Sequence, residues 1–254
     1  MNGSWMLYGL QPTSYVSVWK RMYPVMKHYI PNVQIVWSPN FDLQPNDTSY
    51  WPGSDYVDVV GTSLYWKGFG TNSAMPSSYI ADSMGTVYSV YAAAYNKPFV
   101  ISEASGAWES GPGYSPGTGQ QFSNVTDLVD QATFQMNFWS PILNSDFLDA
   151  YPLLEAAYIF DIAKQEEFWT DFKVSEDVVR GNFTALVNAL DAKGRMKWAT
   201  VNPVTTTTTV PATTQVTTAV AVVIPTTTSV TSSAFRAMKF LYLSVIVSII
   251  YIIF

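Results

Sequence analysis

The sequence contains no cysteine, a single histidine and few charged side chains. The lack of cysteine excludes a disulfide framework and a thiolate metal site. One histidine argues against a histidine-rich zinc centre or a Ser-His-Asp triad. Charged residues make up 13% of the chain, about half of the roughly 25% that is usual. The 13 basic residues are outnumbered by 19 acidic ones, whereas nucleic-acid binding needs clustered Lys and Arg. We therefore expect no metal, no cofactor and no nucleic-acid partner.

Aromatic residues, by contrast, are abundant. They make up 15% of the 254 residues and include 9 Trp and 16 Tyr. Flat apolar rings suit stacking on sugar rings, but they suit a large aromatic core equally well. Composition alone leaves both interpretations open.

Composition divides the chain into three parts. Residues 1–198 have the mixed composition of a globular domain, whereas residues 199–233 are rich in Thr, Ser and Pro and carry no charge. Such a segment buries too little apolar surface to fold, and it is typical of an O-glycosylated stalk. We expect residues 199–233 to be a disordered linker.

The third part, residues 234–254, ends in an apolar run that begins at Phe240. A bilayer-spanning helix needs about 20 residues, more than this run provides. A small-residue site followed by a terminal apolar tail is typical of a glycosylphosphatidylinositol attachment signal, and a C-terminal transmembrane span is the alternative. Either interpretation predicts an extracellular, membrane-anchored protein at the cell surface, although Met1 does not open a signal peptide.

Four short apolar or β-branched runs alternate with four helical stretches. The runs cover residues 33–38, 57–64, 98–102 and 154–160, and the helical stretches cover 14–29, 78–95, 127–144 and 175–190. This alternation predicts parallel βαβ units and an α/β fold. A (β/α)₈ barrel needs eight such units, and four would leave sheet edges unpaired. No Gly-rich turn of a dinucleotide-binding sheet follows any of the four. We therefore expect part of a barrel.

Catalytic residues of a parallel barrel lie at the C-terminal ends of its strands. Here these ends carry Trp37 and Asn40, then Tyr65 and Trp66, then Glu103. A carboxylate at such a rim, flanked by hydroxyl groups, has the chemistry to attack an anomeric carbon. Taken alone, Glu103 is equally consistent with a surface glutamate.

Several ordered motifs resemble glycoside hydrolase family 26. They are residues 1–5 (MNGSW), 36–40 (VWSPN), 51–61 (WPGSDYVDVVG) and 97–103 (KPFVISE), with weaker similarity at Phe160-Asp161, Lys164 and Asp171-Phe172. Each motif alone is weak, and their order makes the resemblance specific over residues 1 to about 196. It implies the C-terminal part, about strands 5–8, of a (β/α)₈ TIM barrel.

The resemblance also implies roles for single residues. Glu103 would be the nucleophile, and Tyr65 would donate a hydrogen bond to it. The acid/base glutamate would stand immediately before Met1 and is not in this sequence; because Met1 lies inside the family motif, we expect the native chain to extend upstream. Substrate contacts would come from five residues, namely Asn2, Trp5, Trp37, Asn40 and Trp66.

These roles predict a retaining endo-β-1,4-mannanase that acts on mannan or glucomannan. The same family holds β-glucanases and β-1,3-xylanases, so the preferred glycan stays open. The alternative is a catalytically inactive cell-surface protein that binds glycan or belongs to the wall, and the 254-residue chain is expected to be inactive without its acid/base. The expected partners are a β-linked polysaccharide and, through the C-terminal tail, a membrane; we expect a monomer.

Overall fold

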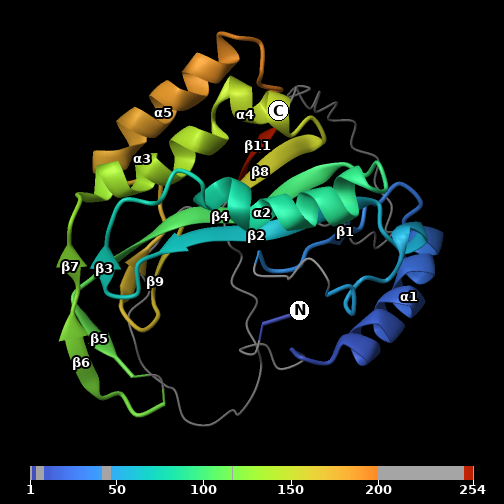
Figure 1. The fold of residues 1–254 in the computed structure, drawn as a ribbon, viewed down its shortest axis with the longest axis horizontal. Helices are drawn as coiled ribbons and strands as arrows, with labels where there is room; N and C mark the ends of the chain where they lie inside the picture. The colour runs from blue at the N-terminus through green and yellow to red at the C-terminus, as the bar shows by residue number, and fades with distance from the viewer. Residues whose placement is uncertain (1, 4–8, 42–46, 116, 199–248, 254) are drawn as a thin grey trace, which may run out of the picture. The chain divides into compact units, whose positions relative to one another are not determined.

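The computed structural model describes residues 2–3, 9–41, 47–115, 117–198 and 249–253. Four parallel strands lie side by side in chain order: β1 (Val36–Trp37), β2 (Val59–Lys67), β4 (Phe99–Ser110) and β8 (Leu154–Phe160). The predicted parallel strands and the α/β class are therefore confirmed (Figure 1). The assignment of these strands to the second half of a barrel stays a prediction.

Each predicted helical stretch contains a helix. The helices are α1 (Pro12–Tyr29), α2 (Tyr79–Val87) with the π-helical η2 (Tyr88–Ala93), α3 (Gln131–Ile142), α4 (Ser145–Ala150) and α5 (Asp177–Asp191). In the third predicted stretch the helix, α3, begins later than the predicted residue 127. Asp130 is its N-cap, and its side chain accepts a 2.7 Å hydrogen bond from the Thr133 amide. An N-cap carboxylate satisfies amides that the first helical turn leaves unpaired.

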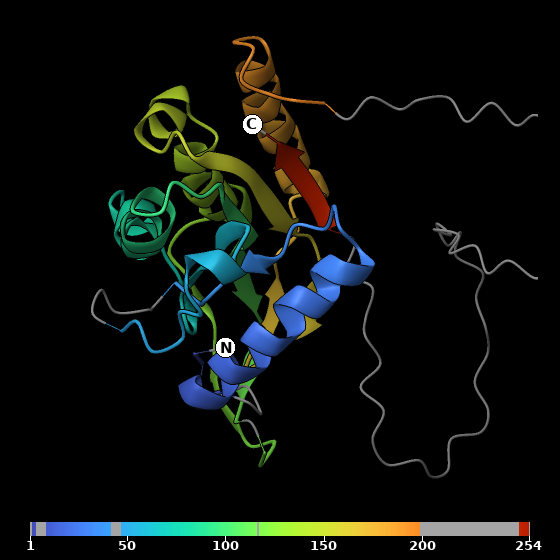
Figure 2. The same ribbon diagram turned by 90° about the vertical axis from the view of Figure 1, so that its right-hand side faces the viewer.

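The main core lies between the sheet and its helices. Figure 1 shows α2 and α3 on one side of β2 and β4, and Figure 2 shows the same layering from the side. Leu64 and Ile101 of the sheet and Phe138 and Trp139 of α3 are fully buried in one cluster. At about 25 cal/mol per Å² of apolar surface, such large side chains hold the layers together.

The sheet is mixed, because short antiparallel strands extend it. β4 runs on to Ser110, where β10 (Trp169–Asp171) pairs with it in antiparallel fashion, and β9 (Ala163–Gln165) pairs with β10. The predicted strand end at Ser102 is therefore wrong: the apolar run marks only the start of β4, and the remainder, although largely buried, is held by its pairing with β2 and β10. Smaller elements are η1 (Ser54–Tyr56), β3 (Thr71–Asn72) with β7 (Thr126–Asp127), and the hairpin of β5 (Pro112–Tyr114) and β6 (Gln121–Asn124).

The outer edge of β8 is paired, contrary to the expectation of an open edge there. β11 (Ile249–Ile253) runs antiparallel to β8, with Ile249 opposite Phe160 and Ile253 opposite Ala156. The predicted linker and residues 234–248 and 254 lie outside the described residues. Among the residues that are described, no helix has the length and apolar character to cross a membrane.

Candidate active site

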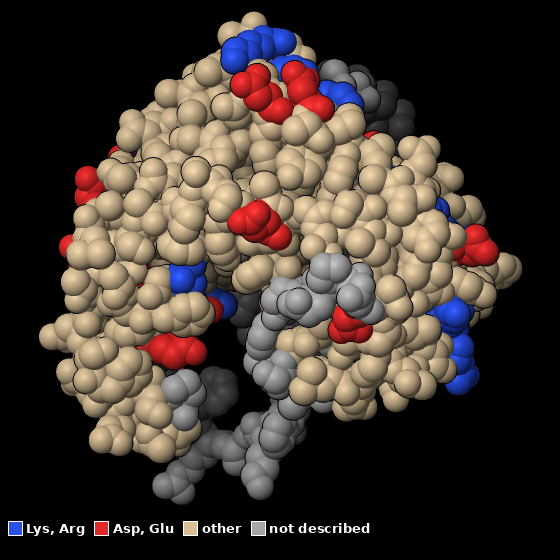
Figure 3. All heavy atoms as spheres, in the orientation of Figure 1, with Lys and Arg blue, Asp and Glu red and all other residues tan. Residues whose placement is uncertain are grey.

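A pocket of about 530 Å³ opens on the face of β2 and β4 that lies away from α2 and α3. Figure 3 shows the molecule hollowed there, with basic and acidic side chains at the edge of the hollow. The residues that line it are polar, charged and aromatic: Asn40, Ser63, Tyr65, Lys67, Phe69, Glu103, Ala107, Phe160, Lys164, Glu166, Glu167 and Phe172.

The alternation of β2 decides which side chains reach this pocket. Successive side chains of a strand point to opposite faces, so Ser63, Tyr65 and Lys67 line the pocket. Trp66 points the other way, where its ring packs 4.9 Å from that of Tyr79 and its indole N–H donates to the Ser73 carbonyl. The predicted substrate contact of Trp66 is therefore corrected: this side chain packs against α2.

Glu103 lies in the middle of β4, beside a break in strand register. On the β2 side the register shifts between Thr62 and Ser63, and on the β8 side between Ile101 and Ala104. Such bulges turn side chains away from the regular pleat and are common beside active sites. Glu103 is exposed to the pocket although its neighbours on β4 are largely buried.

Tyr65 and Glu103 meet across β2 and β4. The Tyr65 hydroxyl donates a 2.9 Å hydrogen bond to Glu103 Oε2. Burial raises the pKa of Tyr65, and the negative charge of Glu103 raises it further. The hydroxyl therefore keeps its proton and acts as the donor of this bond.

The two predicted asparagines also meet at the pocket. The Asn40 backbone amide donates a 2.9 Å hydrogen bond to Asn2 Oδ1, and the Ser63 hydroxyl donates a 2.8 Å bond to Asn40 Oδ1. The first bond places Asn2 beside the pocket-lining Asn40. Trp5, the other predicted contact in this segment, lies outside the described residues.

Trp37 does not reach the pocket. Its side chain is completely buried, and its indole N–H donates a 3.0 Å hydrogen bond to the Tyr50 carbonyl. The ring packs between Trp51 and Tyr91. The prediction that Trp37 contacts substrate is therefore wrong for this fold, because the hydrophobic core takes up the whole indole.

Aromatic rings form one wall of the pocket beside Glu103. The rings of Phe160 and Phe172 meet edge to face at 5.1 Å, and each lies within 5.7 Å of the Tyr65 ring. The Lys164 ammonium group stands 5.1 Å from the centre of the Phe160 ring. The wall thus offers apolar surface next to a carboxylate, which suits a sugar ring.

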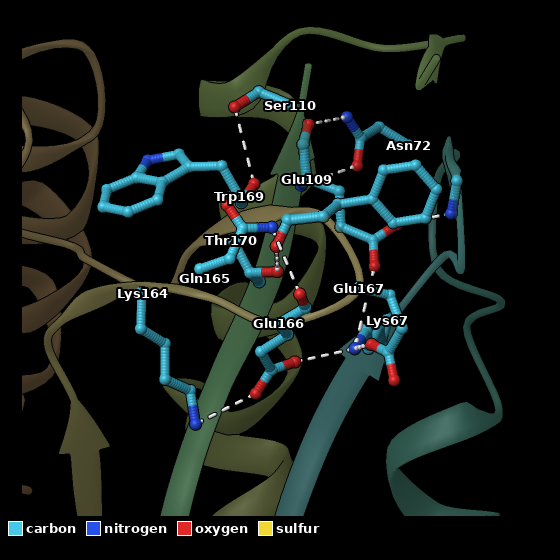
Figure 4. A network of polar contacts seen from close by, with 12 residues as sticks. Lys67, Asn72, Glu109, Ser110, Lys164, Gln165, Glu166, Glu167, Trp169 and Thr170 are labelled. Atoms are coloured by element: carbon cyan, nitrogen blue, oxygen red, sulfur yellow. Dashed lines mark hydrogen bonds and ion pairs between the residues drawn. The ribbon is translucent and has the colours of Figure 1, made fainter. Parts of the chain in front are cut away.

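A cluster of charges forms the other end of the pocket (Figure 4). The Lys67 ammonium group donates 2.7 Å hydrogen bonds to both Glu166 and Glu167 and lies 3.8 Å from Glu109. Burial raises the pKa of Glu166, but bonds from Lys67 and Lys164 outweigh this and leave it below its ordinary value. Lys67 thereby fixes the β9–β10 hairpin, which carries both glutamates, to β2.

Glu109 is the buried member of this cluster. It is part of β4, and its side chain is fully buried. Its Oε2 accepts a hydrogen bond from the Gly70 amide, while its Oε1 has no hydrogen-bond partner. Burial raises the pKa of Glu109. This carboxyl group is structural, since it contacts the backbone and does not line the pocket.

Four residues that line the pocket are not among the predicted site residues: Lys67, Phe69, Glu166 and Glu167. The alternation of β2 beyond Tyr65 would have indicated Lys67. The two glutamates reach the pocket only through the pairing of β9 and β10, which no local pattern indicates. Within the described part of the chain, no three His, Cys, Asp or Glu side chains are placed to hold a metal ion.

Comparison with known proteins finds a family match over one part of the chain. Residues 1–108 match glycosyl hydrolase family 26. A mannan endo-1,4-beta-mannosidase of Bacillus subtilis (strain 168) is 32% identical over 79 residues, which cover 26% of this chain and 21% of that protein. Mannan endo-1,4-beta-mannosidase A and B of Caldalkalibacillus mannanilyticus is 31% identical over 75 residues, covering 26% of this chain and 15% of that protein. The match thus spans about a fifth or less of either relative.

Among solved structures, a modular endo-beta-1,4-mannanase from Cellulomonas fimi is similar to this chain. It is 16% identical, with a TM-score of 0.45, over 73% of this chain and 38% of that one.

Proposed function

We propose that this chain, whose residues 1–108 carry glycosyl hydrolase family 26 sequence, holds the nucleophile of a retaining endo-β-1,4-mannanase. The observation that carries the proposal is the exposed carboxylate of Glu103, which lies in an open pocket and accepts a hydrogen bond from Tyr65. An exposed, oriented carboxylate beside apolar rings can reach the anomeric carbon of a bound sugar.

In the proposed reaction a Glu103 oxygen attacks the anomeric carbon and forms a glycosyl ester. The bond to the leaving oxygen breaks, and its electron pair stays on that oxygen, which an acid protonates. The same group, now a base, takes a proton from the water that cleaves the ester. Tyr65 positions the Glu103 carboxylate and takes no proton itself.

The acid/base partner is proposed for the position directly before Met1. That position is two residues from Asn2, and two residues span at most about 7 Å. Asn2 is bonded to Asn40 at the pocket. A glutamate there lies within reach of the pocket, and retaining chemistry requires its carboxyl group about 5 Å from that of Glu103.

The proposed substrate is mannan or glucomannan. Both curated relatives are mannan endo-1,4-beta-mannosidases, and the wall of Phe160, Phe172 and Tyr65 offers flat apolar surface to a neutral sugar. We further propose that the protein is held at the cell surface by a lipid added near its C-terminus. A cell-surface location suits an enzyme whose substrate is an extracellular polysaccharide.

A mechanism-based label tests the nucleophile without requiring the acid/base. 2,4-Dinitrophenyl 2-deoxy-2-fluoro-β-mannoside has a leaving group that departs without protonation, and its fluorine slows hydrolysis of the ester. We expect the 254-residue chain to release dinitrophenolate once and to retain the fluorosugar on the peptide containing Glu103, as found by mass spectrometry. Glu103→Gln should not be labelled.

Label on another carboxylate would contradict the assignment of Glu103. No label, together with binding of mannan oligosaccharides, would favour an inactive glycan-binding protein instead. Label confined to a glucoside or xyloside analogue would change the proposed substrate and leave the nucleophile in place.

A further inference from the structure

The β5–β6 hairpin displays aromatic side chains but no charge. Residues 110–125, which include the hairpin, contain no Asp, Glu, Lys or Arg. Phe122 is 55% exposed and Tyr114 is 39% exposed. Figure 1 shows where the hairpin lies, and Figure 3 shows in the same orientation that the surface there is mostly uncharged. Exposed rings without charged neighbours form an unusual surface on a chain with net charge −6.

Phe122 is held in place by buried structure beneath it. The edge of its ring meets Phe168 at 5.4 Å, and Phe168 is only 2% exposed. A side chain at Gly113 would bring its Cβ within 2.5 Å of the Phe122 ring, so glycine permits this close approach. The ring is therefore fixed at one edge by packing and remains open to solvent over more than half of its area.

The exposed rings continue into the pocket that contains Glu103. Phe69 lines that pocket and is 75% exposed, and the next residue, Gly70, lies against Phe168. On the other side of the hairpin the Tyr114 amide donates a 2.7 Å hydrogen bond to the Glu167 carbonyl, and the Glu167 side chain lines the pocket. Buried Phe168 thus packs against both Gly70, next to the pocket-lining Phe69, and the ring of Phe122.

We propose that Phe69, Phe122 and Tyr114 form a distal sugar-binding surface for the part of a neutral β-linked glycan that extends beyond the pocket. The inference rests on the proposed function and adds a second binding region to it. Sugar rings present flat apolar faces that stack on aromatic rings, while their hydroxyl groups need hydrogen-bonding partners. The hairpin supplies such partners in exposed Gln120 and Gln121.

Chain length separates this surface from the pocket. We expect a trisaccharide to occupy the pocket alone and a hexasaccharide to reach the hairpin as well. Binding of mannotriose and mannohexaose to the 254-residue chain is measured by isothermal titration calorimetry. We expect Phe122→Ala to weaken mannohexaose binding about 10-fold, which corresponds to one stacking contact, and to leave mannotriose binding unchanged.

Two further variants separate stacking from folding. Phe122→Trp keeps an aromatic face and should bind mannohexaose as well as the unaltered chain, whereas Phe122→Leu keeps the packing on Phe168 but should lose affinity as Phe122→Ala does. Tyr29→Ala, which removes an even more exposed ring from α1, should change neither affinity.

The proposal is overturned if the unaltered chain binds mannohexaose no better than mannotriose. It is equally overturned if Phe122→Ala binds both as the unaltered chain does, in which case the rings serve another partner such as a protein. The proposed nucleophile is tested separately, because Phe122→Ala should still be labelled at Glu103 by the small fluorosugar, and Glu103→Gln should still distinguish the two oligosaccharides.

Discussion

The Tyr65 hydroxyl stands 2.9 Å from Glu103 Oε2 and joins β2 to β4 at the centre of the pocket. Neither residue is at a strand end; Glu103 lies beside the shifts in strand register, and Tyr65 follows in the regularly paired part of β2. The bond fixes one carboxylate oxygen and leaves the other free to face a substrate.

Tyr65→Phe should slow labelling of Glu103 by the fluorosugar about 10- to 100-fold, because a hydrogen bond to a charged group contributes roughly 1.5–3 kcal/mol. Stopped-flow measurement of dinitrophenolate release gives the rate. Tyr29→Phe, which alters an exposed hydroxyl on α1, is the control and should label at the normal rate. An unchanged rate in Tyr65→Phe would mean that the Tyr65 hydroxyl does not position the nucleophile.

Glu103→Ala should remove nearly all mannan hydrolysis from a chain that carries the acid/base glutamate before Met1. Added azide should partly restore turnover and give a glycosyl azide of inverted configuration, since a small anion can occupy the vacated position. Reducing-sugar release and NMR of the product are the measurements. Glu155→Ala, an exposed carboxylate of β8, should keep full activity. More than about a tenth of normal turnover in Glu103→Ala would refute the nucleophile, because covalent catalysis supplies several kcal/mol.

Lys67→Met should lower the free energy of unfolding by about 3 kcal/mol, because it leaves the carboxylates of Glu109, Glu166 and Glu167 without their shared cation. Urea denaturation followed by tryptophan fluorescence measures the loss. Lys193→Met removes an exposed lysine and should change the stability by less than about 0.5 kcal/mol. Equal stability of the two variants would show that the cluster does not hold the β9–β10 hairpin.

In the unaltered protein, Glu109 should make the free energy of unfolding fall as the pH rises above 4.5. Glu109→Gln should reduce this pH dependence. Burial raises the pKa of Glu109 above its ordinary value of 4.5, so the folded state binds this proton more tightly than the unfolded state. Folding is then favoured at low pH, and that advantage is lost as the pH rises through the raised pKa. Urea midpoints between pH 4 and pH 7 test this. An identical pH slope in both proteins would contradict a raised pKa of Glu109.

Phosphatidylinositol-specific phospholipase should release the mature protein from cells that express the complete native chain, if a lipid is attached near its C-terminus. Deleting residues 240–254, which removes the attachment signal, should instead give a freely secreted form. Immunoblots of medium and membranes measure both. Retention after phospholipase with extraction only by detergent would favour a transmembrane span.

Much of the fold could be predicted from local patterns. The buried runs around Val60, Ile101 and Ile159 are apolar and short, and they alternate with amphipathic stretches, so that strand, helix and parallel order follow from periodicity. Glu103 and Tyr65 were found together because a resemblance named them. The length of β4, the position of β10 and the pairing of β11 with β8 could not be predicted, since each depends on a partner strand far along the chain.

The sequence by itself determined the α/β class, the four strands and the identity of the candidate nucleophile, because these depend on local periodicity and ordered motifs. Tertiary structure alone decided which side chains share the pocket. It buried Trp37 and turned Trp66 toward α2, since alternation and core packing override aromatic character. It also brought Glu166 and Glu167 to Lys67 across about 100 residues of sequence, a contact that only the pairing of β10 with β4 makes possible.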